Sequence, residues 1–348
     1  MTVTLPEGVN TPVFLLDVAR LRTNLEAAKR VREEADCKVL LATKAFAMPA
    51  VFPMMRDYLD GTTASGEHEA IMGHDEFGKE VHVYSPAYTQ DEVERLTKVA
   101  QHIYFNSAEQ LARFGAIARD AGCKVGLRVN PGYSNATLGG DLYNPTAPGS
   151  RFGEVPGMLD SVDWSGVDIF HVHALCESLH QGSVGLIEFV ADNFRKYIEQ
   201  VSAVNFGGGH FLNKPGYDVD ALIAAIKAFK AKFDVEVVLE PGAGLVVNTG
   251  ELVATVLALH RNELDLAILD ASASTHMPDV LEVPYRPDII GAGDPGELAH
   301  TYRLGGKTCM TGDVLGDYSF PEPLVPGQQL IFTDQMHYSF VKTNTFNG

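Results

Sequence analysis

Eight short apolar, β-branched segments recur along residues 38–239, and amphipathic segments separate most of them. Buried parallel strands have this character, and each must be joined to the next by a crossover, usually a helix. The alternation predicts a (β/α)8 barrel over residues 17–250. A doubly wound sheet is the alternative, weakened because no Gly-x-Gly-x-x-Gly follows the first segment. The predicted strands are Lys38–Thr43, Gly61–Ala64, Val81–Ser85, His102–Phe105, Lys124–Val129, Val167–Val172, Ser202–Phe206 and Val235–Leu239.

Helix-start signals lie between these segments. Asp17 precedes a segment with leucines at helical spacing, and the stretches Thr89–Glu92 and Ser107–Gln110 have the pattern of a capping box. The helix that begins at Ser107 is expected to end at Gly122, and a further helix is expected over Ala221–Phe233.

After about residue 250 the helical periodicity fades, and strand-like segments alternate with Gly and Pro. These segments are Leu252–Leu259, Leu264–Asp270 and Gln329–Thr333. They predict a C-terminal β domain, which the N-terminal segment Val13–Leu16 is expected to join. The predicted domains are therefore a barrel at 17–250 and a β domain made of 1–16 and 251–348.

The net charge of the chain is −18 at pH 7. Such a charge repels nucleic acid and anionic membranes and attracts cationic ligands, although solubility alone also explains it. No segment is apolar enough to span a bilayer, and the N-terminus lacks the features of a signal peptide. Four scattered cysteines, Cys37, Cys123, Cys176 and Cys309, predict free thiols and a cytoplasmic protein.

Lys44 follows the first predicted strand directly. The C-terminal ends of barrel strands carry the active site, so this amine lies where chemistry is expected. Desolvation there lowers the pKa of an amine and frees its lone pair, which makes Lys44 a candidate for an imine with a carbonyl compound. A surface lysine that closes a strand is the plainer interpretation.

Two loops after late strands carry further candidates. Gly207, Gly208 and Gly209 follow the seventh strand, and exposed backbone N–H groups in such a loop often bind phosphate. Glu240 ends the eighth strand, before Pro241 and Gly242, and could accept a proton from a heterocyclic nitrogen. Tight turns and a loop acid are the alternatives.

His171 and His173 lie two residues apart, so they share a face if both belong to the sixth strand. Cys176 and His180 are near, but their spacing is not that of a typical zinc site, and we expect no metal. His173 is better suited to stack on a flat cofactor. His171 is expected to be a hydrogen-bonded core histidine.

The segment Gly306–Asp313 carries a thiol, Cys309, between glycines. A thiol in such a loop can donate a proton or act as a nucleophile, and Asp313 can bind an amine. A structural cysteine in a loop is the alternative.

Together these residues resemble the fold-type III pyridoxal-phosphate decarboxylases, the family of the ornithine and diaminopimelate decarboxylases. The likeness extends from Lys44 to Tyr338 and is strongest to the carboxynorspermidine (carboxyspermidine) branch. Further signatures are His173–Glu177, His276–Asp279, Pro284–Pro287 and the tail Tyr338–Gly348. The resemblance implies an alanine racemase-like barrel with a C-terminal β domain, and pyridoxal 5'-phosphate as cofactor.

The resemblance also implies roles for the candidates. Lys44 is similar to the Schiff-base lysine, His173 to the stacked histidine, Glu240 to the partner of the ring nitrogen and Tyr338 to a tyrosine that reaches the phosphate. The glycine loop and Gly242 would complete the cofactor site. Cys309 and Asp313 resemble a segment donated to the neighbouring active site of a homodimer. Acids for the substrate amines are sought among Asp313, Asp270, Glu177, Asp279 and Glu282, with His276 as a further substrate-binding candidate.

Two departures from the family pattern are informative. Leu175 and Cys176 stand where many relatives have Gly-Ser, and Ala243 replaces the Arg of ornithine-type enzymes. Both suit decarboxylation of carboxynorspermidine, carboxyspermidine or both over ornithine or diaminopimelate. A racemase of the same fold is disfavoured because racemases carry an Arg where Glu240 stands, and a non-catalytic cofactor carrier would not need the Cys309 segment.

Overall fold

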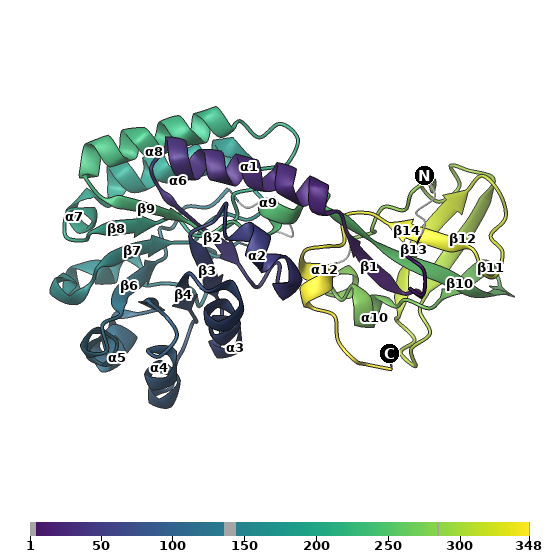
Figure 1. Ribbon diagram of the computed structural model, residues 1–348, viewed down its shortest axis with the longest axis horizontal. Coiled ribbons are helices and arrows are strands. Elements are labelled where there is room, and N and C mark those ends of the chain that lie inside the picture. Colours follow the sequence, from purple (N-terminus) through teal and green to yellow (C-terminus); the bar gives the residue numbers. More distant parts are fainter. Residues whose placement is uncertain (1–4, 136–143, 284, 348) are drawn as a thin grey trace. The chain divides into compact units, whose positions relative to one another are not determined.

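The computed structural model describes residues 5–135, 144–283 and 285–347 (Figure 1). Residues 1–4 of the predicted β domain, Pro284 of the predicted signature and the last residue of the tail, Gly348, lie outside them. The chain divides into two compact units, one of residues 22–245 and one of residues 1–21 with 246–348. The predicted domain limits, at residues 16/17 and 250/251, stay a prediction.

The first unit is the predicted barrel. Eight described strands close into a parallel ring in the order of the sequence, and the last, β9, pairs with the first, β2. All eight predicted strands are confirmed, with bounds that differ by at most a few residues. The strands are β2 (Lys38–Ala42), β3 (Gly61–Ala64), β4 (Glu80–Tyr84), β5 (His102–Phe105), β6 (Lys124–Val129), β7 (Ile169–Val172), β8 (Ala203–Asn205) and β9 (Glu236–Leu239).

Helices surround these strands (Figure 1). They are α1 (Val18–Glu34), α2 (Phe52–Met55), α3 (Glu67–Met72), α4 (Gln90–Leu96), α5 (Ala108–Asp120), α6 (His180–Asn193), α7 (Arg195–Ile198), α8 (Val219–Phe233) and α9 (Ala243–Val246). Shorter helical turns span Pro49–Val51, Gly73–Phe77, Pro156–Ser161 and Trp164–Gly166. In the part of the chain that the structure describes, no helix is long and apolar enough to cross a membrane.

The three predicted N-terminal caps are present, but only one of the two predicted capping boxes is complete. The carboxylate of Asp17 accepts the backbone N–H groups of Ala19 and Arg20 at the start of α1. Thr89 and Glu92 form a complete capping box at the start of α4. At α5 the hydroxyl of Ser107 accepts the N–H of Gln110, but the Gln110 side chain does not accept the N–H of Ser107 in return: its Nε2 donates to the Pro86 carbonyl, and its Oε1 has no partner among the described residues.

The second unit is a curled sheet. Its described strands are β1 (Val13–Leu16), β10 (Gly250–Asn262), β11 (Leu264–Leu269), β12 (His300–Gly305), β13 (Val314–Phe320) and β14 (Gln329–Phe332). The order is β1-β10-β11-β12-β13, with β14 also paired to β10. Three short helices accompany them: α10 (Ala273–His276), α11 (Asp279–Glu282) and α12 (Tyr338–Val341).

The β domain and its N-terminal strand are therefore confirmed, since β1 pairs with β10 along its whole length. Strands β12 and β13, which lack a predicted counterpart, pair with each other across the loop that carries Cys309. The core of this unit is apolar, with Leu252, Leu269 and Phe332 among its fully buried residues.

Candidate active site

Four neighbouring barrel strands end at predicted site residues. Strand β7 pairs with β8, β8 pairs with β9, and β9 pairs with β2. His173 follows β7, the glycine loop follows β8, Glu240 follows β9 and Lys44 lies two residues beyond β2. Because parallel strands present their C-terminal ends at one mouth of the barrel, these groups gather there.

Lys44 lies in a tight turn, in which Ala45 N–H donates to the Ala42 carbonyl at 3.0 Å. Burial lowers the pKa of its amine, and the positive charge of Arg128 lowers it further. The carboxylates of Glu240 and Glu69 act in the opposite direction. The neutral, nucleophilic form of Lys44 is thus more accessible than that of an ordinary lysine.

Glu240 is only 4% exposed. Its Oε1 accepts a hydrogen bond from Asn205 Nδ2 at 2.7 Å, and its Oε2 lies 3.8 Å from His171 Nε2. Neither ring nitrogen of His171 has a hydrogen-bond partner among the described residues, so the predicted hydrogen-bonded core histidine is wrong. Burial holds the pKa of His171 well below its usual range, so the ring is neutral and Oε2 of Glu240 has no strong donor from it.

The glycine loop is fixed by close packing. Gly207 and Gly209 have φ of 65° and 86°. A Cβ on Gly209 would lie 2.4 Å from the Leu175 carbonyl oxygen, and one on Gly208 would lie 2.8 Å from that of Glu240. Only glycine therefore fits, and the loop can approach a ligand closely.

Two N–H groups of this loop bind neighbouring side chains. Gly207 N–H donates to Asn205 Oδ1 at 2.8 Å, and Gly208 N–H donates to His173 Nδ1 at 3.3 Å. The loop therefore orients both side chains, and its role toward a phosphate stays a prediction.

His173 is oriented by that bond, and its backbone carbonyl accepts Arg128 Nη2 at 3.0 Å. Burial and the nearby charges of Lys44 and Arg128 hold the pKa of His173 well below its usual range. The ring is therefore neutral, which suits stacking against a flat aromatic group.

Arg128 is a site residue that the sequence reasoning missed. It lies on β6, is 5% exposed, and its guanidinium carbon is 4.4 Å from the centre of the Tyr84 ring. Its position could have been inferred, because Lys124, Gly126 and Arg128 alternate with apolar residues along the strand.

Gly242 and Glu177 lie in two loops at the same end of the barrel. A Cβ on Gly242 would lie 2.6 Å from that of Ala45, so this glycine lets the loop after β9 pack against the turn of Lys44. Glu177 has a φ of 43° and precedes Ser178, whose N–H donates to the Gly209 carbonyl at 2.8 Å. The loops after β7 and β8 thus support each other.

Two predicted substrate acids have partners inside the sheet unit. Asp270 accepts Thr11 Oγ1 at 2.5 Å and Thr255 N–H at 2.7 Å. Asp313 accepts Ala273 N–H at 2.8 Å and Thr308 Oγ1 at 2.6 Å. These contacts favour structural roles, in which Asp313 holds the loop of Cys309 against α10.

The remaining candidates also belong to the sheet unit. Cys309 is exposed at the loop between β12 and β13, and its N–H donates to Asn347 Oδ1 at 3.1 Å. His276 accepts Ser272 N–H at 3.1 Å, and burial lowers its pKa. Tyr338 begins α12. All four cysteines are free, as predicted.

Residues 24–335 match the family described as pyridoxal-dependent decarboxylase, C-terminal sheet domain. The chain is 42% identical to carboxyaminopropylagmatine decarboxylase of Synechocystis sp. over 97% of its length and 87% of that protein. It is 39% identical to carboxynorspermidine/carboxyspermidine decarboxylase of Campylobacter jejuni over 98% and 91%.

A solved structure agrees with these relatives. Carboxynorspermidine decarboxylase from Campylobacter jejuni, complexed with norspermidine, superposes with a TM-score of 0.88 at 37% identity, covering 98% of this chain and 92% of that one. The barrel, the sheet unit and these full-length likenesses lead to one conclusion: the chain belongs to the pyridoxal-dependent decarboxylases and is an enzyme of that family.

Proposed function

We propose that this enzyme removes the α-carboxylate of a carboxylated polyamine, carboxynorspermidine or carboxyspermidine, to give norspermidine or spermidine. The observation that carries the proposal is the buried carboxylate of Glu240, which directly follows the strand β9 paired with β2, the strand that precedes Lys44. The names of two full-length relatives support the substrate class.

The residues at the barrel mouth fit pyridoxal 5'-phosphate, the cofactor of this family. Lys44 offers an amine of lowered pKa to its aldehyde, and the glycines after β8 leave no Cβ in the way of a phosphate. When bound, the cofactor supplies an electron sink for the pair left behind when carbon dioxide departs. We assign Lys44, His173, the glycine loop, Glu240, Gly242 and Tyr338 to hold it.

Glu240 has the role of holding a proton on the ring nitrogen. Its Oε1 is engaged by the hydrogen bond from Asn205, which leaves Oε2 to accept from that proton. An arginine at this place would disfavour the ring proton, so the acid favours decarboxylation over racemisation. His173 and Arg128 exchange no proton in this step and orient the site.

Two groups compete to return a proton to Cα after decarboxylation. Lys44 is within the barrel site, whereas Cys309 is an exposed thiol on the sheet unit. The exposure of Cys309 supports a homodimer in which each subunit offers this thiol to the active site of its partner. We further propose that the enzyme works in the cytoplasm, where four free cysteines stay reduced.

The distal amines of the substrate need carboxylates. Glu177, in the loop after β7, is a candidate of the barrel unit, and the net charge of −18 attracts polycations. Asp279 and Glu282 are less available, because both form ion pairs with Lys342.

Carboxyaminopropylagmatine is the second candidate substrate. It carries a guanidinium group where the polyamines carry an amine. The Synechocystis decarboxylase named after this compound is 42% identical to this chain over 97% of its length.

The decisive experiment is carbon dioxide release from five substrates compared side by side: carboxynorspermidine, carboxyspermidine, carboxyaminopropylagmatine, ornithine and diaminopimelate. We expect kcat/KM to be highest for one of the first three, and Lys44→Ala to abolish release. Release from ornithine or diaminopimelate alone would exclude the proposal. Loss of optical activity without carbon dioxide would identify a racemase.

A further inference from the structure

A line of polar side chains fills the interior of the barrel behind Glu240. It consists of Asn205, Tyr104, His82, Glu80 and Lys38, and we call it the interior chain. The first three are completely buried. Barrel interiors are usually filled by branched apolar residues, so a polar line through this core requires an explanation.

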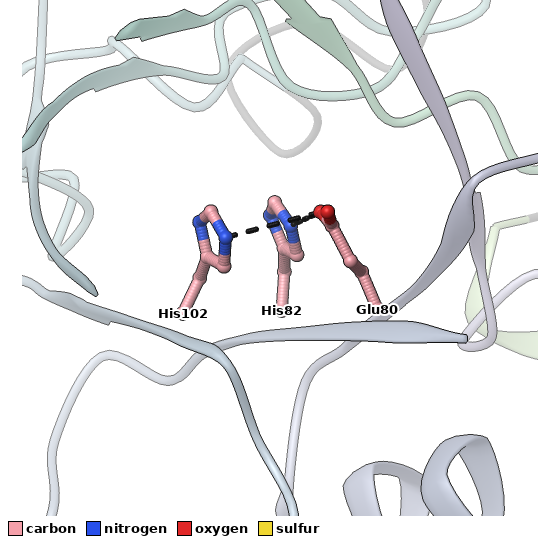
Figure 2. Close-up of side chains that lie close together, drawn as sticks. All are labelled: Glu80, His82 and His102. Atoms are coloured by element: carbon pink, nitrogen blue, oxygen red, sulfur yellow. Dashed lines mark hydrogen bonds and ion pairs between the residues drawn. The ribbon is translucent and has the colours of Figure 1, made fainter. Parts of the chain in front are cut away.

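The interior chain is continuous. Asn205 Nδ2 lies 2.7 Å from Glu240 Oε1 and 3.0 Å from Tyr104 Oη. Tyr104 Oη lies 2.7 Å from His82 Nδ1. His82 Nε2 lies 3.2 Å from Glu80 Oε2. A dashed line in Figure 2 marks this contact. Lys38 Nζ lies 2.7 Å from Glu80 Oε1 and forms a second ion pair with Glu236.

The proton positions along the interior chain follow from one backbone contact. Gly207 N–H donates to Asn205 Oδ1, so the Asn205 amide must turn its NH2 group toward Glu240 and Tyr104. The hydroxyl oxygen of Tyr104 accepts one of these protons, so its own proton goes to His82 Nδ1. His82 is then protonated on Nε2, which donates to Glu80.

The negative charge of Glu80, at the end of the interior chain away from Glu240, keeps the hydrogen bonds pointing in this direction. The hydrogen bond from His82 is the largest cause that lowers the pKa of Glu80 to about 2, and Lys38 lowers it further. Glu80 is thus a permanent acceptor at neutral pH. Burial raises the pKa of Tyr104 far above its usual value, so its hydroxyl stays protonated.

We propose that the interior chain is a positioning device for Glu240: it locks the Asn205 amide so that Glu240 Oε1 always receives a donor, and the carboxylate is thereby oriented to hold the proton on the ring nitrogen of the cofactor. The inference rests on the proposed role of Glu240. With Asn205 reversed, its carbonyl oxygen would face the carboxylate, the bond from Gly207 would be lost, and Tyr104 could bond to Asn205 only by turning its own proton away from His82.

A metal ion bound by Glu80, His82 and His102 is the alternative explanation for the end of the interior chain away from Glu240. Ligand atoms of Glu80, His82 and His102 lie within 4.8 Å of one another. Yet the two imidazole rings stack at 3.8 Å with 10° between their planes, and Figure 2 shows them side by side instead of converging. His102 Nδ1 has no partner within the described parts of the chain, whereas a metal-bound histidine usually donates its second nitrogen. Lys38 already neutralises Glu80.

Tyr104→Phe tests the interior chain, because it removes one hydroxyl and keeps the ring that packs on Gly126. We expect a lower visible absorbance of the lysine-bound cofactor relative to its near-ultraviolet band. We also expect kcat to fall about threefold to tenfold, the size of one net hydrogen bond, with KM unchanged. Tyr318→Phe is the matched control, since the Tyr318 hydroxyl is buried and donates to the Pro287 carbonyl at 2.6 Å but belongs to the sheet unit, outside the interior chain.

A double-mutant cycle separates positioning from structure. If Tyr104 acts through Glu240, Tyr104→Phe should change neither spectrum nor kcat further in a Glu240→Gln background. Additive effects would overturn the inference. Should Tyr104→Phe not fold, Glu80→Gln at the partly exposed end of the interior chain should give a smaller shift of the same sign, and an unchanged spectrum would reject it.

The outcomes distinguish a failure of the proposed role of Glu240 from a failure of the proposed role of the interior chain. If Glu240→Gln leaves the spectrum and kcat unchanged, the proposed role of Glu240 fails. If Glu240→Gln shifts both but Tyr104→Phe and Asn205→Leu shift neither, only the interior chain fails. Stoichiometric metal in the purified enzyme, lost in Glu80→Gln, would assign the far end to a metal site and overturn the inference.

Discussion

At Gly209 both the backbone conformation and the surrounding atoms favour glycine over any other residue. Its φ is positive, and the position of a side chain is taken by the Leu175 backbone. Gly216, in the loop before α8, has nearly the same φ of 89°, but a Cβ there would meet no described atom within 4 Å. The pair separates the cost of the backbone conformation from the cost of a steric clash.

Gly209→Ala should therefore destabilise the enzyme more than Gly216→Ala, by about 1–3 kcal/mol, the usual cost of overpacking. Cofactor affinity should fall only in the first variant, because its loop must move away from the site. Urea denaturation and titration of the apo-enzyme with pyridoxal phosphate measure the two effects. Equal losses in both variants would show that the contact with Leu175 does not matter.

Glu80 gives the fold a dependence on pH. Its pKa is lowered from 4.5 to about 2 in the folded protein, so the unfolded chain binds the proton more readily. Its stabilising contribution is complete above the unfolded value and is lost as the pH falls from about 4.5 toward 2.

The difference in melting temperature between wild type and Glu80→Gln should therefore be constant at neutral pH and shrink in this acidic range. Glu109→Gln is the control, since Glu109 pairs with Arg113 on the surface of α5 and should matter little at any pH. A difference that stays constant down to pH 2 would contradict the assignment.

At the scale of elements, the capping signals show what a sequence can and cannot predict. Thr89–Glu92 and Ser107–Gln110 have the same pattern, yet only the first forms the complete box. The Gln110 side chain finds the Pro86 carbonyl instead, and that partner comes from another loop of the fold. Strands β12 and β13 were missed for a related reason: their polar, partly exposed faces are joined by the pair Arg303–Asp317, which alternation of apolar residues does not reveal.

The candidate site also contains residues that could be predicted from the sequence and residues that could not. Lys44 and Glu240 were predictable because each is a charge beside an apolar strand. The interior chain was not, because His82 and Tyr104 lie on the paired strands β4 and β5, whereas Asn205 lies on β8, which only closure of the barrel brings opposite them.

Thr89→Ala should lower the free energy of unfolding by about 1 kcal/mol through the loss of the cap at α4. Thr89→Ser keeps the hydroxyl and should lose much less. Chemical denaturation compares them, and an equal loss for Ser and Ala would mean that the methyl group of Thr89, and not its cap, stabilises the helix.

At the scale of the whole molecule, the proposed homodimer makes each active site depend on Lys44 of one subunit and Cys309 of the other. Lys44→Ala and Cys309→Ala should each be nearly inactive when purified alone. Co-expressed and purified together, they should recover about a quarter of wild-type activity, because half of the dimers would contain one intact site.

Each variant co-expressed with itself is the control for this recovery. Absence of recovery, in a mixture that light scattering shows to be dimeric, would mean that Cys309 serves its own subunit or none. The result also decides between the two proton donors, since full activity of Cys309→Ala would leave Lys44 as the donor.

Strands β2 and β9 come from opposite ends of the barrel sequence and meet only when the ring is complete. Lys44 and Glu240 follow these two strands, so under their proposed roles the complete cofactor site exists only after the last strand has paired with the first. A chain released before β9 could present its lysine to an aldehyde but could not hold the ring nitrogen. Under the proposed roles, the part of the visible absorbance that depends on Glu240 would report that folding of the barrel has finished.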